Sequence, residues 1–92
     1  MRPSKSYFYK MLYNDISHEL KKNKDLYFID FACGHGQLLH DLKFKNYIGV
    51  DIDKNEIISL KTIFPEKKFY YEDILFFKSP IKADIACCVE TF

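Results

Sequence analysis

The sequence predicts an α/β fold with three layers, in which a parallel sheet carries helices on both faces. Two observations predict it: short apolar runs alternate with amphipathic segments along the chain, and acidic or glycine residues stand where several apolar runs end. Strands that alternate with helices pair in parallel through right-handed crossovers, and the helices cover the sheet. With 92 residues, 48% of them hydrophobic, the chain can form one small domain with a genuine core.

The first two elements are a helix over residues 6–22 and a strand over residues 26–32. The apolar residues of the helix recur every four positions, which is the spacing of one helix face, and tyrosines flank them: Phe8, Leu12, Ile16 and Leu20, with Tyr9 and Tyr13 beside them. The strand, "LYFIDFA", is nearly continuously apolar. Such a run is typical of a strand that is buried on both faces.

A glycine-bearing turn at 33–36 leads into a second helix, which we expect to run from Leu38 to about residues 44–46. "YIGVDI" at 47–52 is the second strand. Asp53 and Glu56 resemble a capping box, in which Asp53 accepts from exposed amides and Glu56 reaches back. The helix that they begin must end near residue 64, because a proline follows at position 65.

"KFYYEDIL" at 68–75 is the third strand, with Asp73 close to its carboxyl end. An irregular segment begins at Phe76 and Phe77, and Pro80 interrupts it. "ADIACCV" at 83–89 is the fourth strand. We find no internal repeat and no low-complexity stretch.

Charge, hydropathy and cysteine usage limit which ligands and partners the sequence predicts. The formal net charge is +1, and basic and acidic residues are interspersed, so nucleic-acid binding is not indicated. No apolar run is long enough for a membrane span and the first ten residues lack a signal core, which favours a cytoplasmic protein without a membrane partner. Cys33, Cys87 and Cys88 are an odd number, and we interpret them as reduced thiols. Together with His35 they match no usual zinc spacing, so no metal is predicted.

The candidate site lies where the strands end. Ligands of open parallel sheets bind beyond the carboxyl ends of the strands, and six residues fall at or just past those ends: Asp30, Gly34, Gly36, Asp51, Asp73 and Glu90. A dinucleotide site would need a third glycine, but its place is taken by Leu39 or Gln37, depending on where the count begins. A nicotinamide-dependent oxidoreductase fragment is therefore the weakest of our hypotheses.

A different ligand suits these residues better. Asp30 can neutralise a cationic group, the glycines leave room for an uncharged link, and the carboxylate of Asp51 can accept from both hydroxyls of a ribose. S-adenosylmethionine has these parts in this order. Its carboxylate can also take amides at the amino end of the following helix.

Four stretches of the chain resemble class I S-adenosylmethionine-dependent methyltransferases. "DFACGHGQL" is similar to the first motif of that family, with Ala32 where glycine is usual, and "GVDID", "YEDIL" and "ADIACCVET" are similar to the next three. The match runs over residues 26–92. The resemblance implies a Rossmann-like domain whose complete form has seven strands, so we expect a single partial domain over 1–92, truncated after about four strands. Residues 1–24 would form its leading helix and 25–92 its cofactor-binding βαβ units.

The resemblance also implies roles for residues. Asp30 would orient the methionine part of S-adenosylmethionine, and a stretch of backbone would pass beneath it: Ala32, Cys33, Gly34, His35 and Gly36. Asp51 would bind the ribose, and the adenine would lie among Ile52, Asp73 and Ile74. Val89 and Glu90 would lie where the methyl group meets its acceptor, and Glu90 is the one candidate for a catalytic base.

Two alternatives to this assignment stay open. Each acidic residue could be structural, as a cap or the end of a strand. The chain could be a non-catalytic remnant that binds a partner through its tyrosine-rich first helix and its sheet.

By resemblance the fourth strand lies beside the first, so its other edge would be bare and would favour self-association or a partner chain. The acceptor is unknown, although "CCVETF" lacks the pattern that in this family accompanies methylation of amino groups on bases or glutamine.

Overall fold

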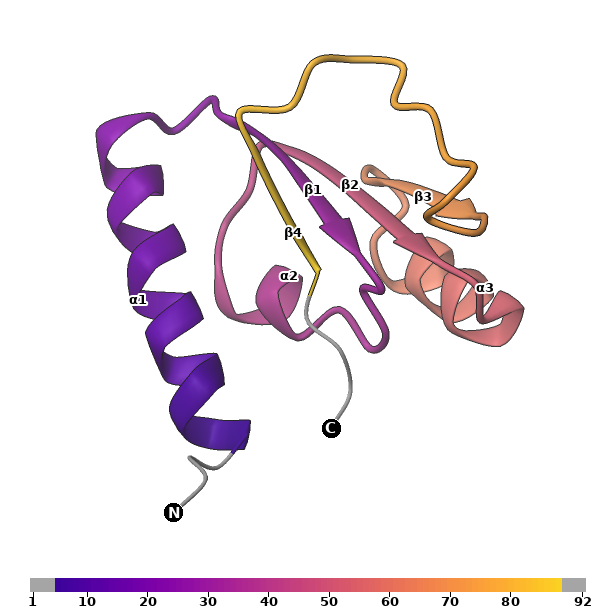
Figure 1. Ribbon diagram of the computed structural model, residues 1–92, viewed down its shortest axis with the longest axis horizontal. Coiled ribbons are helices and arrows are strands. Elements are labelled where there is room, and N and C mark those ends of the chain that lie inside the picture. Colours follow the sequence, from indigo (N-terminus) through magenta and orange to yellow (C-terminus); the bar gives the residue numbers. More distant parts are fainter. Residues whose placement is uncertain (1–4, 89–92) are drawn as a thin grey trace.

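The computed structural model describes residues 5–88, with side chains from Tyr7 onward, and it has three helices and four strands in that part of the chain (Figure 1). In chain order they are α1 (Lys5–Lys22), β1 (Tyr27–Phe31), α2 (Gln37–Asp41), β2 (Asn46–Asp51), α3 (Lys54–Ile63), β3 (Lys68–Tyr71) and β4 (Ile85–Cys88). The predicted order of elements is confirmed. The predicted residues Val89 and Glu90 lie outside the described part.

The four strands form one parallel sheet in the order β3-β2-β1-β4. Asp30 of β1 lies level with Gly49 of β2 on one side and with Cys87 of β4 on the other. The fold class is thus confirmed, and so is the place of β4 beside β1. The strands follow one another from β1 through β2 to β3 on one side, and β4 then lies on the other side of β1. This reversal of strand order is the topological switch point, and the carboxyl ends of β1 and β4, with that of β2 next to them, lie there.

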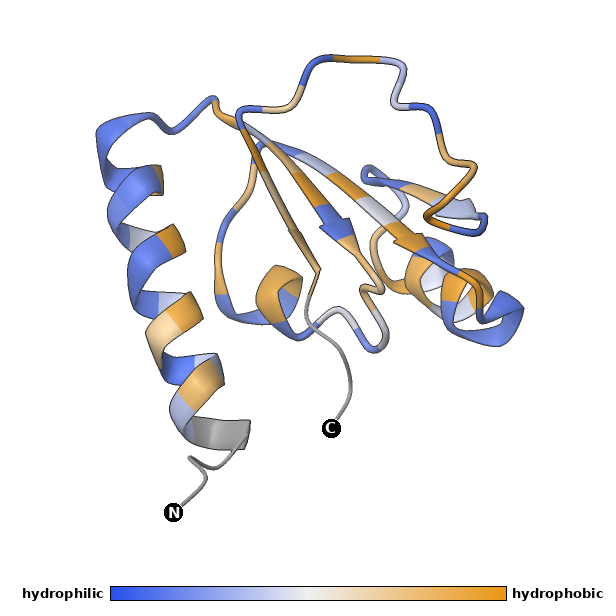
Figure 2. Cartoon of the chain, viewed as in Figure 1, coloured by the Kyte–Doolittle hydropathy of each residue, from blue (hydrophilic) through white to orange (hydrophobic). Residues whose placement is uncertain are grey.

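All three helices cover the same face of the sheet. Their buried side chains join those of the strands in one core cluster, which includes Ile16 of α1, Leu38 of α2 and Leu60 of α3 around Phe28 and Tyr47. In Figure 2 the apolar residues of α1 form a stripe along an otherwise hydrophilic helix. The predicted stripe is therefore confirmed for most of its length, although Phe8, at its amino end, is 46% exposed.

The opposite face carries no helix in the part of the chain that the structure describes. Ile29, Ile48 and Val50 are buried there beneath the connection 72–84, with Phe77 and Ile81 packed against them. Over residues 5–88 the three helices therefore lie on one face, and the connection 72–84 lies over the other. A right-handed crossover from β3 back to β4 must pass over this second face, and it does so as the long extended trace in Figure 1.

Two local expectations need correction: the end of the second helix, and the Glu56 half of the capping box at α3. The second helix ends at Asp41, because residues 42–45 are extended: Leu42 and Phe44 are buried, whereas Lys43 and Lys45 are exposed, which is the alternation of an extended chain. Asp53 caps α3 as predicted, accepting from the amides of residues 55 and 56 at 3.0 and 3.3 Å.

The other half of the predicted capping box does not form. The amide of Asp53 donates to the carboxylate of Asp51 at 2.8 Å, so it has no need of Glu56. The Glu56 carboxylate instead lies 3.1 Å from Nδ1 of His35. His35 is exposed on the surface of the turn.

A tyrosine joins α1 to α2. The hydroxyl of Tyr9 donates to the carboxylate of Asp41, and burial together with Asp41 raises the pKa of Tyr9.

Among residues 5–88, no helix combines the length and the apolar composition that crossing a membrane requires.

Candidate functional site

The turn after β1 has an unusual backbone. Ala32, Gly34 and Gly36 all have positive φ angles, at 58°, 53° and 73°. The amide of Gly36 closes the turn on the carbonyl of Cys33 at 2.9 Å, and the amide of Cys33 donates to the carbonyl of Val50 at 3.2 Å. Only glycine adopts such angles readily, so the chain can turn sharply from β1 into α2 without side chains at positions 34 and 36.

The two glycines meet different demands. A Cβ atom at Gly36 would lie 2.7 Å from Cδ2 of Leu60, so this glycine lets the turn approach α3 closely. A Cβ atom at Gly34 would meet nothing within 4 Å. The backbone at Gly34 therefore faces an open space, as the floor of a ligand site would.

Asp51 ties this turn to the end of β2. Its Oδ2 accepts from the amide of Gly34 and its Oδ1 accepts from the amide of Asp53, both at 2.8 Å. The side chain is only 9% exposed. One carboxylate thus organises both the glycine turn and the start of α3.

Asp30 is buried beneath the same turn, with 4% of its surface exposed. Its Oδ2 accepts from the hydroxyl of Tyr47 at 2.7 Å, and its Oδ1 lies 3.8 Å from the thiol of Cys87. Burial raises the pKa of Asp30 from 3.8 to about 6, the two donors oppose that rise, and the charge of Asp51 adds to it. Asp30 is therefore mostly ionised at neutral pH in spite of its burial.

The thiols near Asp30 stay protonated. Burial raises the pKa of Cys33 and of Cys87 to about 12 each, and the charge of Asp30 contributes to both shifts. All three cysteines, including the exposed Cys88, are free. Over the described residues no group of three or more His, Cys, Asp or Glu side chains could hold a metal ion.

Neither buried carboxylate has a positive partner. Within residues 7–88, no Lys, Arg or His lies within ion-pair distance of Asp30 or Asp51. A buried charge without a counter-charge is costly, and such groups concentrate at functional sites. The electrostatics of this rim thus suit a ligand that brings a cationic group of its own.

The carboxyl end of β3, where Asp73 was predicted to lie, is on the other side of β2 from the 32–36 turn. The amide of Glu72 donates to the carbonyl of Asp51 at 3.0 Å, which holds the start of the connection against the end of β2. Asp73 initiates its own turn there, with Oδ1 accepting from the amide of Leu75 at 2.9 Å. Asp73 thus stabilises its own turn, while Asp30 and Asp51 gather around the glycine turn.

Apolar side chains stand exposed on this part of the rim. Ile52, directly after Asp51, is 68% exposed, and Ile74 is 40% exposed. Exposed isoleucines just past the ends of two strands offer an apolar surface for a flat ring.

Tyr47 is the residue that sequence reasoning missed. Only its place as the first residue of a predicted strand drew attention, whereas its hydroxyl is the closest donor to Asp30. A signal existed, because a buried tyrosine usually requires a hydrogen-bond partner. The observed register of β1 and β2 then places Tyr47, Gly49 and Asp51 on the face on which Asp30 lies.

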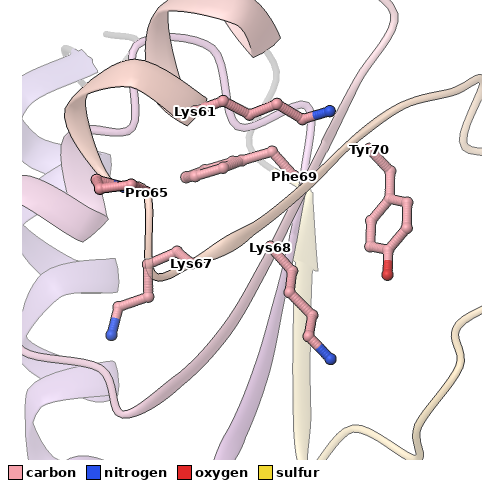
Figure 3. A pocket seen from close by; sticks show the side chains of 6 residues that line it. All are labelled: Lys61, Pro65, Lys67, Lys68, Phe69 and Tyr70. Carbon is pink, nitrogen blue, oxygen red and sulfur yellow. The ribbon is translucent and has the colours of Figure 1, made fainter.

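A hollow of about 450 Å³ lies elsewhere, at the amino end of β3 (Figure 3). It is lined by Lys61, Pro65, Lys67, Lys68, Phe69 and Tyr70. In Figure 3 the three lysine side chains point in different directions rather than toward a common centre. The hollow is also at the opposite end of the strands from Asp30 and Asp51, so we do not assign it to the site.

Comparison with known proteins supports the resemblance through structure. No protein-family model matches the chain, and no curated protein sequence matches it either. Among solved structures, an S-adenosylmethionine-dependent methyltransferase from Clostridium acetobutylicum superposes with a TM-score of 0.68 at 26% identity, over 87% of this chain and 36% of that one.

Two more distant structures share the fold. The sugar N-methyltransferase KedS8 from Streptoalloteichus has a TM-score of 0.70 at 18% identity, over 98% of this chain and 41% of its own. The S-adenosylmethionine-bound amino pentose methyltransferase CalS10 from Micromonospora echinaspora has a TM-score of 0.69 at 15% identity, over 99% and 44%. The chain therefore has the Rossmann-like fold of S-adenosylmethionine-dependent methyltransferases and spans less than half the length of these relatives.

Proposed function

We propose that the chain binds S-adenosylmethionine at the carboxyl ends of β1 and β2, as the cofactor-binding half of a methyltransferase. One observation carries the proposal: Asp30 and Asp51 are buried beside a turn with three positive φ angles, and no described cation neutralises either of them. S-adenosylmethionine brings an ammonium and a sulfonium to such a place. The structural relatives, one of them holding S-adenosylmethionine, support the same assignment.

Each part of the cofactor has a matching group on the rim. Asp30 would attract the cationic methionine end, and the open backbone at Gly34 would pass beneath it. Asp51 would accept from the ribose hydroxyls while keeping its two backbone partners, since a carboxylate offers about four lone-pair sites. Ile52 and Ile74 would hold the adenine between exposed apolar surfaces, with Asp73 near the exocyclic amine.

Methyl transfer itself is the second part of the proposal. It requires an acceptor aligned behind the methyl group in a site that excludes water, more than it requires a protein nucleophile. We propose Glu90 as the base for that acceptor and Val89 as its neighbour; both follow β4 in the sequence. The acceptor is unidentified, and the activity of the 92-residue chain by itself is part of the hypothesis.

Titration calorimetry with S-adenosylhomocysteine tests the binding. The wild-type chain should release heat with a 1:1 stoichiometry at pH 8, and Asp51→Ala should abolish it because the ribose loses its acceptor. Asp51→Asn, which keeps one carbonyl oxygen for the amide of Gly34, should weaken binding at least tenfold, a loss of about 1.4 kcal/mol. Thermal unfolding of both variants separates loss of the site from loss of the fold.

The matched control is Asp15→Ala, an exposed acid on α1 away from the rim, which should bind as the wild type does. Absence of heat from the wild-type chain at millimolar ligand would contradict the proposal. That result would favour the non-catalytic remnant, which predicts a complex with a partner chain and no affinity for the cofactor.

A further inference from the structure

Asp30 is held by a donor that is rigid. The ring of Tyr47 is buried, with centroids 5.4 Å from Phe44 and 6.0 Å from each of Phe28 and Phe69. Three aromatic rings, from β1, β3 and the segment before β2, therefore fix the direction in which the hydroxyl points. That direction is toward Oδ2 of Asp30, at 2.7 Å.

The register of the sheet explains the contact. Asp30 lies level with Gly49, and Tyr47 precedes Gly49 by two residues on the same face of β2. Two residues of strand span about 6.6 Å and neighbouring strands are about 4.8 Å apart, a diagonal that a tyrosine side chain can bridge. Gly49 contributes no side chain, and a Cβ atom there would collide with Phe69 at 2.8 Å.

The other groups that face Asp30 cannot replace Tyr47. Asp51 at the end of β2 carries a negative charge, Cys33 in the turn is a protonated thiol, and Cys87 of β4 offers only a weak sulfur donor at 3.8 Å. Of the side chains described, none near Asp30 is cationic. Among the described residues, the Tyr47 hydroxyl is thus the one strong donor to the Asp30 carboxylate.

We propose that Tyr47 is a positioning residue for cofactor binding, whose hydroxyl keeps Asp30 ionised and oriented beneath the 32–36 turn. This inference rests on the proposed function. Tyr47 does not touch the ligand; it acts through Asp30. Without the hydroxyl, Asp30 binds a proton more readily and loses its attraction for the ammonium of the ligand.

Tyr47→Phe tests the inference, because phenylalanine preserves the aromatic packing and removes only the donor. In the free protein, the pKa of Asp30 followed by carboxyl carbon NMR should rise by about 1 in the variant, the size expected for one hydrogen bond to a charged group. The control Tyr70→Phe, on the opposite face of the sheet, should leave the Asp30 titration unchanged. An unchanged midpoint in Tyr47→Phe would overturn the proposal.

Calorimetry with S-adenosylhomocysteine between pH 5.5 and 8.5 provides the second measurement. Affinity in the wild type should fall as the pH drops through about 6, where Asp30 becomes protonated. Tyr47→Phe should bind roughly 3-fold more weakly near pH 6.5, roughly 8-fold more weakly near pH 5.5, and approach the wild type at pH 8.5. A loss equal at every pH would indicate a merely structural role and overturn the inference.

The two measurements also separate the two proposals. If the wild type binds and the variant has the same pH profile, the role of Tyr47 is wrong and the proposed function stands. If the wild type does not bind at any pH, the proposed function is wrong, and the role of Tyr47 in binding is wrong with it.

Discussion

Ala32 adopts the left-handed backbone conformation that favours glycine, with a φ of 58°. The resemblance of the stretch "DFACGHGQL" to the first methyltransferase motif places Ala32 where glycine is usual. The structure shows the physical consequence of having alanine there. A non-glycine residue in this conformation is strained by about 1 to 2 kcal/mol, so the first position of the turn is a local weak point.

Substitutions in this turn should change stability in opposite directions. Ala32→Gly should raise the free energy of unfolding by roughly 0.5 to 1 kcal/mol, because relief of strain exceeds the added freedom of the unfolded chain. Gly34→Ala should lower it by about 1 kcal/mol through backbone strain alone, since its Cβ meets nothing. Gly36→Ala should cost roughly 2 to 3 kcal/mol, because Leu60 must also move.

Urea unfolding of the three variants measures these differences. The ranking matters more than the absolute values, since all three lie in one turn and share their unfolded state. Equal losses for Gly34→Ala and Gly36→Ala would show that the close approach to Leu60 has no energetic importance.

The residues of the site were predictable to different degrees. Asp30 and Asp51 stood out because an acid that ends an apolar run lies at the rim of a parallel sheet. The Tyr47 contact depends on strand register, which the apolar pattern of two buried strands leaves undetermined. Asp73 was placed at the correct edge, but whether its carboxylate faces a ligand or its own turn is decided by local backbone angles that the sequence does not specify.

At the scale of elements, α3 shows how a short helix is secured. It has ten residues, too few to be stable alone, and two of its apolar residues, Ile57 and Leu60, are buried in the core. Asp53 supplies acceptors for two of its free amides. Asp53 follows Asp51 by two residues and donates its amide to the Asp51 carboxylate, so it links the end of β2, the site and the helix.

Removing this cap should weaken the helix without touching Asp51. Asp53→Ala should lower the free energy of unfolding by about 1 kcal/mol, while Asp53→Asn, which keeps a capping oxygen, should stay within a few tenths of the wild type. Urea unfolding followed by circular dichroism measures both. A loss as large for asparagine as for alanine would contradict the capping role and indicate a need for the charge.

Element boundaries were less predictable than element types. The end of α2 was placed too late because Leu42 and Phe44 continue the apolar content of a helix, whereas they alternate with lysines in extended chain. The helices were assigned to both faces on the general rule for alternating α/β chains. The rule held for the direction of the crossovers, but the crossover after β3 contains no helix within the described residues.

The whole molecule has two unlike faces. Three helices cover one, whereas the connection 72–84 covers the other incompletely and leaves Leu75 and Phe76 82% and 74% exposed. The outer edge of β4 has no neighbouring strand among the described residues. Exposed edges next to apolar surface favour association between chains.

We therefore expect the purified 92-residue chain to self-associate in a concentration-dependent way. Ala86→Lys should reduce the association, because the residue is exposed on β4 and a lysine there opposes edge pairing. Ser59→Lys, on the exposed surface of α3, serves as the control with the same added charge. Light scattering measures the mass, and a monomer at every concentration would refute the expectation.

The unpaired charge of Asp30 has a consequence for the amount of folded chain. Its raised pKa means that ionisation above about pH 6 opposes folding, in a domain too small to have much stability in reserve. A cation bound beside Asp30 offsets that penalty, and the offset is part of the binding free energy by which the ligand stabilises the native state. Under the proposed function, the supply of S-adenosylmethionine in a cell would govern how long the chain survives proteolysis, in addition to whether it can work.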